Sequence, residues 1–157
     1  MKHFLYELKQ PLIKSDLKRF LVEGILSSII FGAFIGALDF YLTVYFQSIL
    51  SIFTFLIFYY FLSNRLFRSF NQYHIIYSIL SVVFLLIGVY MMGFTSQIFY
   101  LEVITGNIAL YHKFLNPLIY FDFVWKWSFD ISVIFFNLLY ILIYVWICRT
   151  IYMQMKR

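Results

Sequence analysis

Long apolar runs separated by short polar breaks dominate the pattern of this chain. Residues 24–63 form a stretch of 40 with a single charge, at Asp39. A helix rises about 1.5 Å per residue, so this stretch measures about 60 Å and can cross a bilayer core of about 30 Å twice. A weak polar break favours a hairpin near residues 43–48. We therefore expect membrane helices at about 20–42 and about 48–64.

Two later apolar runs predict two more membrane helices. One ends at Glu102 and predicts a helix at about 74–101, which is longer than one crossing needs and should tilt or overhang. The last predicts a helix at about 130–148. Backbone amides in lipid must be satisfied within the segment, and the runs lack the alternation of barrel strands. The sequence thus predicts an all-α integral membrane protein with four transmembrane helices.

The first 19 residues predict an amphipathic elbow. Leucines recur there at helical spacing among several lysines. Such a segment is expected to lie on an anionic inner leaflet before the first membrane helix turns in. A docking helix for a cytoplasmic partner is the alternative. A cleaved signal peptide would fit the basic start, but the apolar run that follows is too long and continues into a second span.

Composition excludes the soluble classes of protein. Apolar residues make up 64% of the chain and charged residues only 12%, against roughly 45–50% and about 25% in an ordinary soluble domain. Cys148 is the only cysteine, so an internal disulfide and a thiolate metal cluster are both excluded. We expect residues 1–157 to form a single membrane domain.

The net charge of +5 predicts an orientation rather than a nucleic-acid partner. With four crossings, ten basic residues fall on one side and only Lys113 and Lys126 on the other. This bias predicts that both termini are cytoplasmic. A bacterial plasma membrane fits it best, and an organelle inner membrane is the alternative. The ten residues are Lys2, Lys9, Lys14, Lys18, Arg19, Arg65, Arg68, Arg149, Lys156 and Arg157.

The external loop at 102–129 is unusually apolar and aromatic for a segment in water. We expect it to lie at the outer interface or to dip between the helices. Trp125 and Trp127 flank Lys126 just before the last helix, as in the aromatic belts that anchor membrane proteins. Stacking on a ligand is the alternative role for these tryptophans.

A ridge of small residues in the first helix predicts a close contact between helices. Gly24, Ser28, Gly32 and Gly36 follow one another at intervals of four, so they share one helix face. Membrane helices associate through such residues because the backbones can approach closely. The partner is either another helix of this chain or a second protein.

Three polar residues lie within or beside the apolar runs. Asp39 is the only acid inside them, and it is either a functional buried acid or an interfacial residue near the outer hairpin. Asn137, in the middle of the last helix, is expected to bond to a neighbouring helix, with substrate contact as the alternative. His74 begins a polar stripe with Ser78 and Ser81, and we expect it to snorkel to the interface rather than to bind a metal or haem.

No catalytic or metal-binding motif is present. The sequence has no nucleophile elbow, zinc-protease helix, Walker loop or paired intramembrane carboxylates. We therefore expect no catalytic residue, no metal and no cofactor.

Two short segments resemble the GtrA-like four-helix membrane proteins, which are linked to the movement of polyprenyl-phosphate sugars across the bacterial membrane. Arg19–Gly24 is similar to the start of their first helix, and Ser63–Phe67 to the Asn-Arg end of their second. The long external loop and the fourth helix, which lacks a clear Asn-Arg ending, depart from the pattern. We therefore do not assign the chain to that family.

The function that these features favour is assembly. We expect a small subunit or accessory component of a membrane complex, which contacts other membrane proteins or a second copy of itself through the small-residue ridge and the external loop. The alternative is a transporter or flippase component for a lipid-linked or amphipathic substrate, with Asp39, Asn137 and His74 as its candidate residues.

Overall fold

The computed structural model describes residues 11–46, 51–106 and 130–156, and its regular structure in those ranges is entirely helical. The prediction of an all-α fold is thus confirmed for the described part of the chain. The elements are α2 (Lys14–Phe46), α3 (Ser51–Phe67), α4 (Ile75–Tyr100), the short π-helix η2 (Leu101–Thr105) and α7 (Ile131–Met155).

Three segments in the described ranges are long and apolar enough to cross a membrane, and this makes the chain a membrane-embedded protein. These are Lys14–Tyr45, Ile75–Val103 and Val133–Met155. The remaining helix, α3, has 17 residues, or about 25 Å, which is slightly less than a bilayer core of about 30 Å.

Three helices extend beyond their predicted ends, α3 by three residues to Phe67. α2 begins at Lys14 rather than near residue 20, with Asp16 in its first turn, so the end of the predicted elbow belongs to this helix. An acid in that position is favourable at a helix N-terminus. α7 continues past Arg149 to Met155, because no glycine or proline interrupts it. Of the hairpin expected near residues 43–48, residues 43–46 belong to α2. Residues 1–10 and the rest of that hairpin lie outside the described residues.

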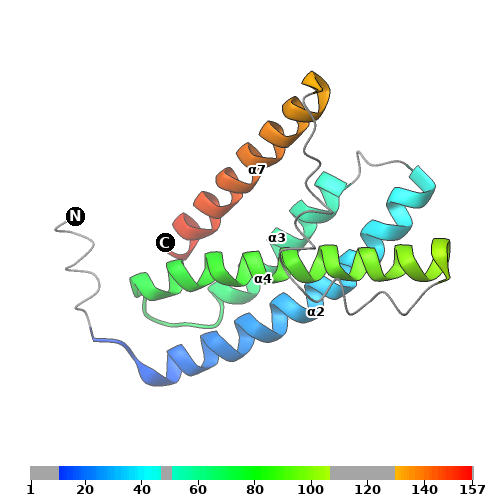
Figure 1. Cartoon of the computed structure of the whole chain (residues 1–157). Coiled ribbons are helices and arrows are strands. Elements are labelled where there is room, and N and C mark those ends of the chain that lie inside the picture. The colour runs from blue at the N-terminus through cyan, green and yellow to red at the C-terminus, as the bar shows by residue number, and fades with distance from the viewer. Residues whose placement is uncertain (1–10, 47–50, 107–129, 157) are drawn as a thin grey trace.

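The helices are arranged so that their basic ends come together. The first residues of α2 and α4 gather at the same end of the bundle as the last residues of α3 and α7 (Figure 1). α4 packs against α2, α3 and α7, most extensively against α2.

The core is concentrated toward this same end. The ring of Phe20 packs against Tyr77 and Phe84 at centroid distances of 4.8 and 5.8 Å, and so joins α2 to α4. Residues from all four long helices are fully buried around this contact: Phe20, Phe58, Leu62, Leu66, Leu85, Ile147 and Ile151.

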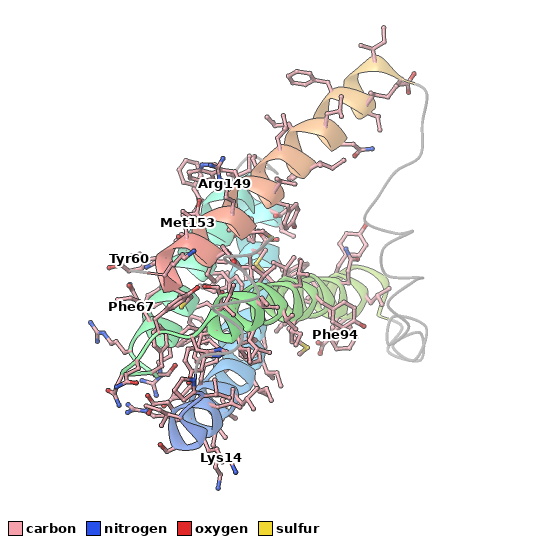
Figure 2. The ribbon with its side chains drawn as sticks, turned by 90° about the vertical axis from the view of Figure 1, so that its left-hand side faces the viewer. Lys14, Tyr60, Phe67, Phe94, Arg149 and Met153 are labelled. Atoms are coloured by element: carbon pink, nitrogen blue, oxygen red, sulfur yellow. The ribbon has the colours of Figure 1, made fainter. Side chains whose placement is uncertain are left out.

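The buried residues of α7 lie in its second half. Its buried residues, Ile147, Ile151 and Met155, recur every four positions, so they form a single stripe. Toward its N-terminal end α7 diverges from the other helices (Figures 1 and 2). Phe135 and Leu142 in that half are 62% and 65% exposed.

Candidate functional site

The small-residue ridge of α2 faces α4 of the same chain. A Cβ added at Gly32 would lie 2.6 Å from the carbonyl oxygen of Gly88, and one added at Gly36 would collide with the backbone of Met92. Gly24 in turn faces the ring of Phe84. The structure therefore places this ridge in a contact within the chain, where it is not exposed to a second protein.

Ser28 adds a polar contact to the same crossing. Its hydroxyl oxygen lies 2.8 Å from the carbonyl oxygen of Phe84 in α4 and 2.7 Å from that of Gly24 in its own helix. The side chain is fully buried. Both carbonyls can share its proton, so the hydroxyl is satisfied without water.

Gly88 is a contact residue that the sequence analysis missed. It lies against Gly32 on one side and against the ring of Phe58 on the other, where a Cβ would overlap the ring. One glycine thus lets both α2 and α3 approach α4. The sequence does contain a pattern that indicates this contact. Ser78, Ser81 and Gly88 are small residues at spacings of three and seven, as expected for one helix face.

Asp39 is tied to the neighbouring helix. The hydroxyl of Thr54 donates a hydrogen bond of 2.7 Å to Oδ1 of Asp39, and so links α2 to the first turn of α3. Asp39 itself is half-buried, whereas Thr54 is buried. The carboxylate therefore lies between two helices, at the end of the bundle opposite to the basic one.

His74 caps α4. Its Nδ1 accepts a hydrogen bond of 3.2 Å from the backbone N–H of Ile76. An acceptor Nδ1 in a neutral imidazole leaves the proton on Nε2, and this buried atom has no hydrogen-bond partner in the described part of the chain. Only 4% of the residue is exposed, so it lies inside the bundle and does not extend to the interface.

Asn137 lies in the outer, diverging half of α7 and is half-buried. It continues the stripe of α7 that is buried further along, since Asn137, Tyr144, Ile147 and Ile151 are separated by three, four or seven residues. Asp39, His74 and Asn137 lie in three different helices, and the structure does not bring them together. Neither do the described residues contain a group of three or more His, Cys, Asp or Glu that could hold a metal ion.

Polar bonds at the basic end connect α2 to the α3–α4 region, and the sequence analysis did not anticipate them. Asp16 accepts hydrogen bonds from the backbone N–H and the side-chain amide of Asn71, at 3.0 and 3.3 Å. Glu23 forms an ion pair of 2.6 Å with Arg65. The sequence shows acidic residues in α2 and a basic residue in α3, but it does not show which segments meet.

Most of the external loop lies outside the described residues, Trp125 and Trp127 included. The described part ends in η2 and Gly106, which has a positive φ of 62°. Glycine adopts this left-handed conformation without steric cost.

No protein-family model, no curated protein and no solved structure matches this chain.

Proposed function

We propose that the chain crosses a bacterial plasma membrane four times, with both termini in the cytoplasm. The gathering of four helix ends at one end of the bundle supports this orientation (Figure 1). The same end carries Lys14, Arg65, Arg68 and Lys156, as the positive-inside rule expects of a cytoplasmic side. α3 spans the core if the bilayer thins slightly or if the helix is flanked by interfacial residues.

We further propose that the protein is a subunit or accessory component of a membrane complex. The observation that carries this proposal is the change in burial along one stripe of α7. Ile147 is fully buried, whereas Tyr140, two turns earlier on that stripe, is 38% exposed. A helix of another membrane protein would continue the contact that α4 makes further along.

The proposed assembly surface is on α7 and not on the small-residue ridge of α2. The ridge is occupied by α4, so a partner cannot use it without displacing a helix of this chain. The stripe of α7 that is buried at Ile147 is 38% exposed at Tyr140, in the half of α7 that diverges from the other helices (Figure 2).

Site-specific photo-crosslinking in native membranes tests the proposal. A photoreactive amino acid at Tyr140 should give a protein adduct of discrete mass, because this position is on the partner-facing stripe. The same label at Leu142, which is 65% exposed on the opposite face, is the control and should react with lipid only. An adduct of twice 19.0 kDa would identify a second copy as the partner. Lipid adducts alone at both positions would contradict an assembly role.

A transporter component is the second candidate, favoured by the bond between Asp39 and Thr54. A carboxylate placed between two membrane helices is a common element of proton pathways. On this hypothesis Asp39→Asn abolishes proton uptake by proteoliposomes, while Thr54→Val, which keeps the carboxylate, only reduces it. Equal uptake by Asp39→Asn and wild type, measured with a trapped pH-sensitive dye, would remove this candidate.

A further inference from the structure

A groove between α3 and α7 combines one basic side chain with several polar ones. Its volume is about 450 Å³, within the range of small-molecule sites, about 300–1,000 Å³. In Figure 2, Arg149 and Met153 of α7 lie on the same side of the molecule as Tyr60 and Phe67 of α3. The lining residues are Tyr59, Trp146, Arg149, Thr150, Met153 and Gln154.

The hydrogen bonds inside this groove fix its walls and leave donors for a ligand. The hydroxyl of Tyr59 donates to Oε1 of Gln154 at 3.0 Å, which orients the amide and leaves its nitrogen with two N–H donors. The hydroxyl proton of Thr150 is used within α7, on the carbonyl of Trp146 at 2.8 Å. Nitrogen donors therefore predominate among the groups that remain.

The positive charge of Arg149 has no counter-charge in the groove. Neither α3 nor α7 contains an aspartate or a glutamate. Within the described ranges, Arg149 makes no ion pair, while Glu23 pairs with Arg65. A guanidinium with free donors recognises an anion that offers several oxygens, and phosphate matches it best because two parallel hydrogen bonds can form.

The position of the groove along α7 favours a lipid as the source of that phosphate. Arg149 is the first charged residue after the apolar run of α7, at the level where a membrane helix passes into the headgroup layer. Trp146 is 59% exposed beside it, and indole rings are enriched at that level. Val145, 61% exposed, extends the apolar surface from the groove toward the membrane interior, where acyl chains would lie.

We propose that this groove binds the headgroup phosphate of an anionic phospholipid. Arg149 is the phosphate ligand, and Gln154 donates a further hydrogen bond from its amide nitrogen. Tyr59 is a positioning residue, because it holds that amide through Oε1. The proposal is independent of the assembly role of the outer half of α7.

Native mass spectrometry of the detergent-purified chain, titrated with phosphatidylglycerol, measures the binding. Arg149→Gln should weaken lipid retention about tenfold, as expected when a bidentate charge-assisted contact is lost. The matched control is Arg68→Gln, which removes one charge from another exposed arginine at the basic end and should bind as wild type does. Equal loss in both variants would show unspecific charge attraction, and no loss in Arg149→Gln would exclude the site; either result overturns the proposal.

Two further arms separate the lipid from free phosphate and test the positioning role. Inorganic phosphate in millimolar excess should leave the bound phosphatidylglycerol in place; displacement would overturn a lipid site in favour of a soluble phosphate. Tyr59→Phe should lower retention in the wild-type background and cause no further loss in a Gln154→Leu background, where the amide that Tyr59 orients is absent. Wild-type retention by Tyr59→Phe, or an equal additional loss in the double variant, would contradict its assigned role.

Discussion

At the scale of single residues, the stability of the bundle depends on glycines, which have no side chain to hold the helices apart. Gly32 and Gly88 meet where the backbones of α2 and α4 are closest, and Gly88 also accommodates the ring of Phe58. Lipid provides no hydrophobic force between helices, so contact at this distance is the main source of their attraction.

Substitution of Gly32 by leucine should destabilise the bundle. Even a Cβ would lie 2.6 Å from the carbonyl oxygen of Gly88, which forces the two backbones apart. The expected loss is about 1–3 kcal/mol, as in other overpacked cores, measured as unfolding in mixed micelles. Ile30→Leu, at a position 58% exposed, is the control and should change stability by less than about 0.5 kcal/mol. Equal stability of the two variants would contradict the α2–α4 crossing.

The same residues show how far sequence reasoning extends. The interval of four between Gly24, Ser28, Gly32 and Gly36 predicts a contact face, because helical geometry fixes which residues share it. The identity of the helix that meets this face depends on the tertiary arrangement, and so on long-range packing that no local pattern contains. The bond from Thr54 to Asp39 escaped prediction for the same reason, since each residue is visible alone but their distance is not.

At the scale of elements, α2 is connected to the α3–α4 region by two polar contacts of different strength. Asp16 is 7% exposed and accepts two hydrogen bonds from Asn71. In the ion pair of Glu23 and Arg65, the arginine side chain is 57% exposed. Solvent screens the second contact, so the first should contribute more to stability.

Two substitutions test this ranking. Asp16→Ala removes both hydrogen bonds to a nearly buried carboxylate and should cost about 1.5–3 kcal/mol, whereas Glu23→Gln should cost no more than about 1 kcal/mol. Thermal unfolding of both variants in one detergent gives the comparison, and added salt should reduce the effect of Glu23→Gln only. A larger effect of Glu23→Gln would mean that the exposed ion pair, and not the buried carboxylate, holds α2 in place.

Element boundaries also mark a limit of sequence reasoning. The apolar run predicts that the last helix ends near residue 148, but α7 continues to Met155. Arg149 predicts the end of the membrane span because a charged side chain leaves the apolar core. A charged side chain does not by itself end a helix, however, because the backbone hydrogen bonds continue past it. Ile151 and Met155 prolong the buried stripe that Ile147 begins.

At the scale of the whole molecule, the number of crossings depends on α3. If α3 crosses, Lys14, Arg68 and Lys156 lie on one side of the membrane and Glu102 lies on the other. If α3 is too short and stays on one side, Arg68 moves to the side opposite Lys14, and Lys156 does so as well. The two topologies therefore differ at positions that are exposed in the structure.

Single-cysteine labelling distinguishes these topologies, because Cys148 is the only native cysteine. In a Cys148→Ser background, cysteine is placed in turn at Lys14, Arg68, Glu102 and Lys156. An impermeant maleimide added to intact cells should label Glu102→Cys at once and the other three variants only after permeabilisation. Labelling of Arg68→Cys in intact cells would show that α3 does not cross, and the clustering of basic residues at one end of the bundle would then need a cause other than membrane orientation.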